Sequence, residues 1–225
     1  MKNYSNDLES IEKLVKEIIN IPNNNDFLEF QIRGLEVISE VKKYHGIRVN
    51  LTGLIGKTRT PFSIDFGIGD VIVPSAVERT LPVLLEELEK PEILTYFLES
   101  TVAEKLDAII SLMEATGRMK DFYDIYYLAT TFDFEGRKLQ EAIYETLSNR
   151  ARAYEEDSVT VTSRLKEDID IQKRWKNFCK KVLKYELDFS HVIEVIINFT
   201  LLPYIAMIHE DEFLKNWRYE KREYY

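Results

Sequence analysis

The sequence predicts an α+β protein in which a sheet-forming first part precedes a helical second part. Three runs near the N-terminus, residues 27–32, 47–55 and 62–68, carry apolar side chains at every second position. That alternation is typical of strands with one covered face. From Ser100 onward apolar residues recur at helical spacing instead. A chain of 225 residues is long enough to build both parts around real cores.

The first part, residues 1–98, is predicted to be an α/β domain. An amphipathic helix over residues 8–20 opens it, because apolar residues recur there at helical spacing. The three strands follow. Residues 35–43 fit a strand and a helix equally well, so both assignments stay open. Residues 92–97 are predicted to form a short last strand.

The second part, residues 99–225, is predicted to be a helical domain. Its tail, residues 217–225, is charged and aromatic, and either packs on the body or frays. The predicted helices are residues 101–115, 119–131, 136–150, 163–185 and 189–208.

The charge balance limits the binding partners that the chain can have. Thirty basic against thirty-nine acidic residues give a net charge of −9, so we expect no broad basic face for nucleic acid, while a local basic groove stays open. The single cysteine, Cys179, excludes a disulfide within the chain and is predicted to be half-buried in a lysine-rich helix. The polar N-terminus and the interrupted apolar run 192–208 predict a cytoplasmic protein without a membrane partner.

Lys105 stands out because it lies among apolar neighbours in a predicted helix. It follows Val102 by three residues and precedes Ile109 by four, so it lies in or beside the apolar stripe of that helix. A lysine in this place either extends its ammonium group outward to solvent or holds it against a buried acid or a phosphate. The sequence leaves both interpretations open.

The next predicted helix carries a polar ridge. Arg118, Asp121 and Asp124 follow one another at intervals of three residues. Asp121 falls in the first helical turn, where a carboxylate is favoured by the helix dipole. Asp124 lies beside core positions and needs a partner, and Lys105 and Arg118 are the candidates. An ion-pair network that joins two helices would explain the same pattern without any catalytic role.

Asp65 is the third candidate site residue. It lies on the strand face opposite Phe62, Ile64 and Phe66. The small residues Gly67 and Gly69 share its face and leave room for a ligand. An exposed aspartate beside a turn is the alternative interpretation.

These segments resemble a known family of enzymes. The run Phe62-Ser-Ile-Asp-Phe-Gly-Ile-Gly-Asp-Val-Ile-Val-Pro74 is similar to the third-carboxylate strand of AbiEii/AbiGii-type nucleotidyltransferases, the toxin halves of bacterial toxin–antitoxin systems. Glu99 and Glu104-Lys105, followed by Arg118-Met-Lys-Asp121-Phe-Tyr-Asp124, resemble their C-terminal signature. Together the two segments cover residues 62–128, and a weaker resemblance extends over most of the chain.

The resemblance implies an incomplete, mixed sheet of the DNA polymerase beta-like nucleotidyltransferase type, followed by a helical C-terminal region. It implies Mg²⁺ as cofactor and a nucleoside triphosphate as substrate, with two metals clamped by three carboxylates. Asp65 would be the third carboxylate, holding a metal and drawing the proton from the acceptor hydroxyl. Lys105 would meet the triphosphate. Asp121 and Asp124 would orient that lysine or the acceptor, with Arg118 nearby.

One part of the family pattern is not found in this sequence. The family carries a glycine turn and a D-x-D strand before the helix that we match to residues 8–20. The Asp168-Ile169-Asp170 triplet comes later, inside a predicted helix, where residues i and i+2 point about 200° apart and cannot share a metal. We therefore expect a truncated or split enzyme. Loss of the leading strand would bare a sheet edge that a second copy, a complementing N-terminal fragment or a loop would cover.

Two functions follow from these patterns. The first is a toxin that transfers a nucleotidyl group from a nucleoside triphosphate to a hydroxyl of RNA, tRNA or protein, and that is inactive without the D-x-D segment. The alternative is a non-catalytic remnant or interaction module that binds an antitoxin or a nucleotide. A scaffold unrelated to nucleotide transfer is a third possibility, and the period-two strands argue against it.

Overall fold

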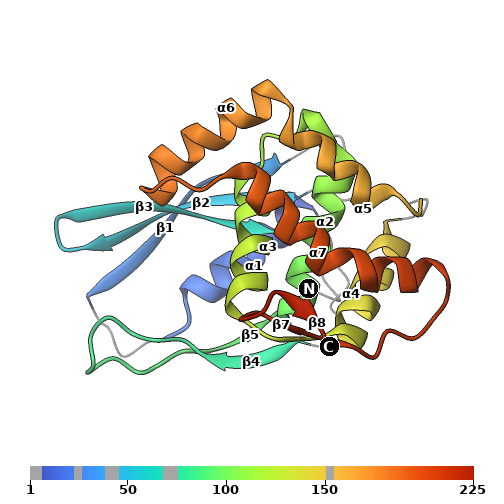
Figure 1. Ribbon diagram of the computed structural model, residues 1–225. Helices are drawn as coiled ribbons and strands as arrows, with labels where there is room; N and C mark the ends of the chain where they lie inside the picture. The colour runs from blue at the N-terminus through green and yellow to red at the C-terminus, as the bar shows by residue number, and fades with distance from the viewer. Residues whose placement is uncertain (1–6, 23–26, 39–45, 68–75, 151–154) are drawn as a thin grey trace. The chain divides into compact units, whose positions relative to one another are not determined.

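The computed structural model confirms a mixed α/β architecture (Figure 1). The chain divides into two compact units, residues 1–70 and residues 71–225, and each is described by itself. The predicted functional boundary between residues 98 and 99 stays a prediction. The structure describes residues 7–22, 27–38, 46–67, 76–150 and 155–225.

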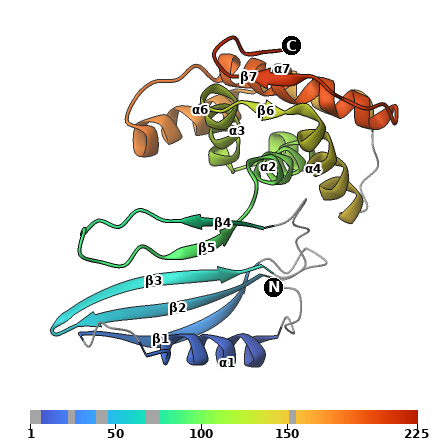
Figure 2. The ribbon, with the colours of Figure 1, turned by 90° about the horizontal axis from the view of Figure 1, so that it is seen from below.

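The first unit is an antiparallel sheet with one helix on one of its faces (Figure 2). Asp7 caps helix α1 by accepting a hydrogen bond from the backbone of Ser10. The buried core lies between α1 and the sheet and contains Ile11, Val15, Ile47, Val49 and Leu51. The elements are α1 (Leu8–Ile19), β1 (Leu28–Ile38), β2 (Gly46–Ile55) and β3 (Thr58–Phe66), with the strands in the order β1-β2-β3.

The strand register sorts the side chains into one apolar and one polar face. Val49 pairs with Ile64 on the apolar face, and Arg48 pairs with Asp65 on the polar face. This confirms that Asp65 lies opposite the apolar residues of its strand. The apolar side of β3 is only partly covered, since Phe62 and Ile64 are 36% and 39% exposed.

The predicted strands have nearly the expected places. Strand β3 begins at Thr58 and ends at Phe66, while residue 68 and Gly69 lie outside the described part. Strand β1 continues to Ile38, so residues 35–38 are strand, and residues 39–43 lie outside the described part. The predicted strand at 92–97 is β5 (Glu92–Thr95), which pairs with β4 (Val77–Thr80), a strand that we did not predict. All strand pairs among the described residues are antiparallel and belong to three small sheets, where we expected one mixed sheet.

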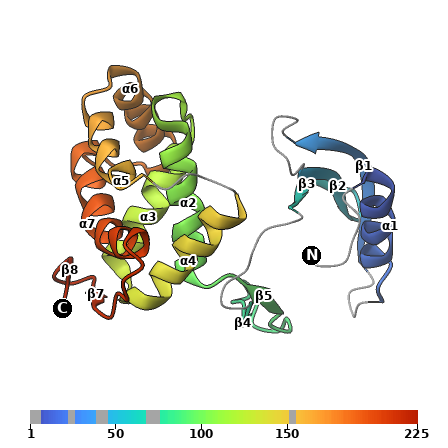
Figure 3. The ribbon, with the colours of Figure 1, turned by 90° about the vertical axis from the view of Figure 1, so that its right-hand side faces the viewer.

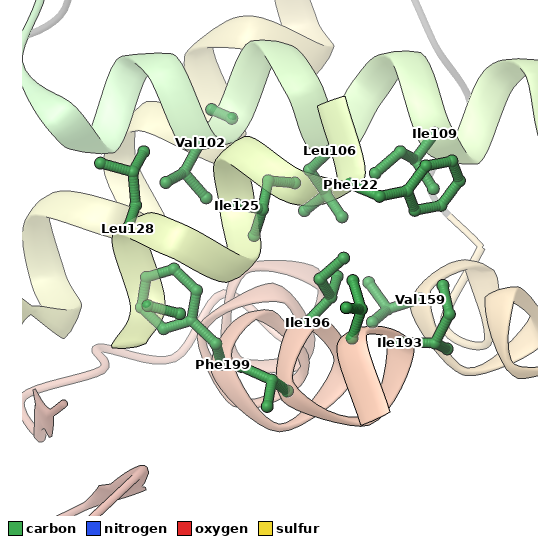
Figure 4. Packing of buried hydrophobic residues seen from close by; sticks show 14 of the residues in the cluster. Val102, Leu106, Ile109, Phe122, Ile125, Leu128, Val159, Ile193, Ile196 and Phe199 are labelled. Carbon is green, nitrogen blue, oxygen red and sulfur yellow. The ribbon is translucent and has the colours of Figure 1, made fainter. Parts of the chain in front are cut away.

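The second unit is built from helices around one apolar core (Figure 4). Three predicted helices are confirmed with nearly the predicted ends, and a fourth begins three residues early. The core includes Phe122 and Ile125 from the third helix in the chain and Ile193, Ile196 and Phe199 from the last. The helices are α2 (Leu98–Leu112), α3 (Met119–Thr131), α4 (Gly136–Asn149), α5 (Ser158–Val161), α6 (Ile169–Phe178) and α7 (Phe189–Ile208).

The prediction of one helix over residues 163–185 is wrong. The segment consists of a 3₁₀ turn (Thr162–Lys166), α6 and a π-helical turn (Cys179–Leu183). The break falls at Asp168, whose backbone is extended and whose carboxylate accepts a hydrogen bond from the Ile171 amide at 2.8 Å. A carboxylate that caps the next helix starts a new helix and does not continue the old one.

The C-terminal tail packs on the helical unit. Strands β6 (Phe134–Glu135), β7 (Asn216–Arg218) and β8 (Glu223–Tyr224) form a small antiparallel sheet. The buried Trp217 donates its indole N–H to the Ala129 carbonyl at 2.7 Å. A Cβ at Gly136 would lie 2.1 Å from the Lys215 carbonyl, so only glycine lets the two backbones approach this closely.

Helix α7 contains a proline and lies in the core. Pro203 has no N–H, which leaves the Phe199 carbonyl, four residues earlier, without its helical donor. The hydroxyl of Tyr224 in β8 donates to that carbonyl instead. Among the described residues α7 is the helix with the length and hydropathy of a membrane span, and half of the qualifying window is buried inside the protein, as in a core helix.

Candidate functional site

Helices α2 and α3 bring four of the predicted site residues together. Lys105 comes from the middle of α2, Arg118 directly precedes α3, and Asp121 and Asp124 lie on its first turns. Asp121 and Asp124 are three residues apart, so both carboxylates face α2. We call this group the Lys105 cluster.

The ammonium group of Lys105 lies between the two carboxylates. Its Nζ is 3.1 Å from Asp121 Oδ1 and 2.6 Å from Asp124 Oδ2. The lysine side chain is 20% exposed, and those of Asp121 and Asp124 are 10% and 19% exposed. The sequence left open whether this lysine extends to solvent or meets buried acids, and the structure shows the second.

Two further cations border the same carboxylates. Arg118 Nε lies 3.3 Å from Asp121 Oδ2, a buried oxygen that makes no hydrogen bond of good geometry among the described residues. Lys120 Nζ lies 2.5 Å from Asp124 Oδ2. Three cations around two anions leave an excess of positive charge, and Arg118 and Lys120 are mostly exposed.

The ion pairs keep Lys105 protonated. Burial on its own lowers the pKa of a lysine, because it disfavours the charged form. The hydrogen bonds to Asp124 and Asp121 outweigh that effect, so the pKa of Lys105 lies above its ordinary value. The group is therefore a fixed cation at neutral pH, suited to hold an anion and unsuited to act as a base.

Glu104 and Lys105 are neighbours in the sequence but serve different faces of α2. Glu104 pairs with Arg150 at the end of α4, and Arg150 Nη1 also lies 3.2 Å from the buried Asp107 Oδ2. Arg150 was not among the predicted site residues. A basic residue after the last apolar position of a helix is too common to predict such a contact.

Asp65 belongs to the first unit and has its own partner. Arg48, opposite it on β2, donates to both carboxylate oxygens, Nε to Oδ1 at 2.7 Å and Nη2 to Oδ2 at 2.8 Å. The hydrogen bonds from Arg48 hold the pKa of Asp65 below its ordinary value. A carboxylate with a lowered pKa remains deprotonated at neutral pH, which suits a metal ligand better than a proton acceptor.

The described residues do not by themselves build a magnesium site. Oxygen donors of the Asp65 kind suit Mg²⁺, but both oxygens already bind Arg48, and one carboxylate is not a two-metal clamp. Across the described ranges, no three acidic, histidine or cysteine side chains gather as metal ligands would. Asp168 caps α6 and Asp170 pairs with Lys173, so both acids have local partners. The expectation that Asp168 lies inside a helix is wrong, because its backbone is extended and precedes the first turn of α6.

Comparison with known proteins places the chain in a family. Residues 2–195 match the family described as nucleotidyl transferase AbiEii toxin, type IV TA system. Comparison with curated proteins finds no match, and comparison with solved structures finds none either. The matched range spans most of the chain and contains both Asp65 and the whole Lys105 cluster. The chain therefore belongs to the AbiEii family of nucleotidyltransferase toxins of type IV toxin–antitoxin systems.

Proposed function

We propose that the chain transfers a nucleotidyl group from a nucleoside triphosphate to a hydroxyl of RNA, tRNA or protein, and that Lys105 meets the triphosphate. The observation that carries this role is the clamp of Asp121 and Asp124 on the Lys105 ammonium group. A fixed, half-buried cation is a point charge of the kind that binds phosphate. In the proposed complex the exposed part of Lys105 contacts phosphate oxygens while the two aspartates hold its position.

Arg118 and Asp65 have supporting roles in this proposal. The Arg118 guanidinium is more than half exposed and lies 3.3 Å from Asp121 within the cluster, so its other nitrogens can add a second contact to the triphosphate. Asp65 contributes one carboxylate to a divalent metal, which stabilises negative charge on the phosphates when it is bound. That contribution requires Asp65 to exchange at least one of its Arg48 hydrogen bonds for the metal.

Transfer needs more acidic ligands than Asp65. Two-metal chemistry uses several carboxylates, and the family resemblance assigns two of them to a D-x-D pair on a neighbouring strand. We infer that transfer requires such a pair in addition to Asp65. We also propose that the protein acts in the cytoplasm and that an antitoxin, which the family implies as a partner, binds it.

Nucleotide binding tests the role of Lys105 without depending on transfer. Equilibrium dialysis with each labelled nucleoside triphosphate and Mg²⁺ should show binding by the wild type. Lys105→Met should weaken it tenfold or more, since a hydrogen bond to a charged group is worth about 1.5–3 kcal/mol. Lys105→Arg should retain part of the affinity. Lys166→Met is the matched control, because Lys166 is 25% exposed and pairs with Glu194 elsewhere in the unit.

Three outcomes would change the proposal. Triphosphate affinity that is equal in wild type and Lys105→Met, with both proteins folded, would remove Lys105 from the site. Transfer of label to total tRNA by the wild-type chain alone, abolished in Asp65→Ala, would show that no further ligands are needed. Binding without transfer, even after a D-x-D fragment is supplied, would favour the nucleotide-binding module over the enzyme.

A further inference from the structure

A groove on the helical unit lies apart from the Lys105 cluster residues and is lined by lysines. It has a volume of about 940 Å³ and is formed by α6, the π-helical turn and residues 184–190. These elements lie at the periphery of the unit (Figure 3). Lys176, Lys180 and Lys184 all line it. We call it the α6 groove.

The backbone of the π-helical turn explains how the lysines come together. Lys176 and Lys180 are four residues apart and share one helical face. The turn ends at Lys184, whose φ of 66° places it in the left-handed region, and its N–H bonds the Cys179 carbonyl. This ending keeps Lys184 at the groove as the chain turns towards α7.

The charge of this segment opposes that of the protein. Residues 172–190 contain six basic and two acidic residues, in a chain with a net charge of −9. Asp188 is already engaged, because its carboxylate caps α7 by accepting from the His191 amide at 2.9 Å. Glu186 is the other acid of the lining. Lys176, Lys180 and Lys184 are exposed and form no ion pair with any residue that the structure describes, so their charge is free for an external anion.

Aromatic side chains lie next to the lysines. The Tyr185 ring lines the groove and is 50% exposed, and its hydroxyl is 3.1 Å from that of Tyr123 on α3. Tyr123 in turn stacks on Tyr127 with ring centroids 6.2 Å apart. Buried Trp175 forms the wall and donates its N–H to the Leu187 carbonyl. Lysines alone would suit any polyanion, whereas an exposed ring beside them offers a flat surface for a base.

We propose that the α6 groove binds a single-stranded segment of nucleic acid. The three lysines contact successive phosphates, and Tyr185 stacks with a base, which is the combination that single-strand binding sites use. A concave groove with a polar aromatic fits a strand better than a lipid surface, which a protruding apolar face would engage. The proposal goes beyond nucleotide transfer, because the site needs neither a triphosphate nor a metal.

Binding of labelled 12-nucleotide RNA and DNA single strands of the same sequence tests the lysines. Fluorescence anisotropy of the full chain, without nucleotide or Mg²⁺, should show binding that weakens with salt. The variant Lys176→Gln/Lys180→Gln/Lys184→Gln should bind at least tenfold more weakly. Its slope of log K against log salt should be shallower by about 2, since each phosphate contact to a single strand contributes about 0.7.

A matched variant separates local from overall charge. Lys13→Gln/Lys90→Gln/Lys221→Gln makes the same change in net charge at three exposed lysines outside the groove and should leave affinity and slope unchanged. The triple lysine-to-arginine variant at the groove keeps the three charges and should bind like the wild type. This result would show that the glutamine variant loses affinity because it loses charge and not because it misfolds. Equal losses in both glutamine variants, or no loss in either, would overturn the proposal.

A second arm tests the aromatic contact. Tyr185→Ala should weaken binding about tenfold without changing the salt slope, because stacking involves no counterion release. Tyr123→Phe removes the tyrosine–tyrosine hydrogen bond but keeps the Tyr185 ring, and should bind normally. Tyr144→Ala, at a tyrosine that is also 50% exposed but lies on α4, is the control. Binding of anionic phospholipid vesicles, with the same lysine dependence and no binding of either strand, would replace nucleic acid by a membrane surface.

Discussion

The charged residues of the candidate site are held in ion pairs, and the pairing decides what each of them can do. Lys105 would cost free energy in an apolar stripe if it had no anion, and Asp121 and Asp124 supply two. Removing one partner of such a half-buried group leaves the other charge uncompensated. The same contacts that hold Lys105 in place therefore also make it sensitive to substitution.

The Asp65–Arg48 pair gives a prediction about pH. The pKa of Asp65 is lower in the folded protein than in the unfolded chain, so the pair stabilises the fold above the ordinary carboxyl pKa of about 3.9. That stabilisation is lost as the pH falls through the lowered pKa. In urea unfolding, the free energy of unfolding of wild type should be slightly larger than that of Asp65→Asn at pH 7. This difference should vanish in acid. Both side chains are largely exposed, so solvent screening keeps the effect small.

Glu17→Gln is the control for this measurement, because Glu17 is an exposed acid of the same unit. The Glu17→Gln substitution should change the free energy of unfolding by the same amount at pH 7 and in acid. A difference between wild type and Asp65→Asn that grows as the pH falls would contradict the lowered pKa.

The candidate residues were predictable from the sequence, but their partners were predictable only in part. Spacing placed Asp121 and Asp124 on one ridge, because helical geometry fixes which residues of a helix share a face, and the need of Asp124 for a partner made Lys105 and Arg118 the candidates. It could not predict Arg48 as the partner of Asp65. That contact depends on the register of β2 and β3, which only the folded sheet sets.

The start of a capped helix in this chain is set by its capping residue and not by the apolar pattern of its interior. Asp7, Asp168 and Asp188 each accept a hydrogen bond from the backbone three residues later and thereby fix the start of a helix. Apolar periodicity continues across such a cap without a gap, which is why it predicted one helix over residues 163–185. The acid at the break was present in the sequence, but we assigned it to the interior of a helix.

Asp168→Ala should destabilise the protein by about 1 kcal/mol, the usual cost of losing an N-cap. Asp170→Ala, two residues away, should cost close to nothing, since its side chain is 74% exposed and its distance to Lys173 is 3.4 Å. Denaturant unfolding of the two variants makes the comparison. Similar effects of both substitutions would show that the two acids act together, as a metal-binding D-x-D would.

At the scale of the whole molecule, the residues that the structure describes form two separate cores. One contains five buried residues between α1 and the sheet, and the other is the large core of the helical unit. Both tryptophans, Trp175 and Trp217, belong to the second core. Tryptophan fluorescence therefore reports on the helical unit alone, while circular dichroism reports on both.

This separation makes a prediction for unfolding. Ile11→Ala removes a fully buried side chain of the smaller core and should cost about 2–5 kcal/mol there. The circular dichroism transition should gain an early phase, while the fluorescence midpoint stays where it is. Ile18→Ala, at a 47% exposed position of the same helix, should change neither. A common shift of both signals would mean that the two units unfold as one.

The sequence predicted the order of sheet and helices, because period-two and helical patterns are local. It did not predict how strands pair. Strand β4 is four residues long and mostly exposed, so it has almost no apolar pattern, and it is defined by its partner β5. The antiparallel pairing in three small sheets is likewise a property of contacts between distant segments, which no local pattern encodes.

The hydroxyl of Tyr224, which stands in for the missing amide of Pro203, makes two distant positions dependent on each other. Tyr224→Phe should lower the free energy of unfolding by about 1–3 kcal/mol, because it leaves the buried Phe199 carbonyl without a hydrogen-bond donor. Adding Pro203→Ala should recover much of that loss, since alanine restores the donor one turn along the helix. A double-mutant cycle would record this as strong non-additivity. An alteration at either position is thus tolerated or harmful according to the residue at the other.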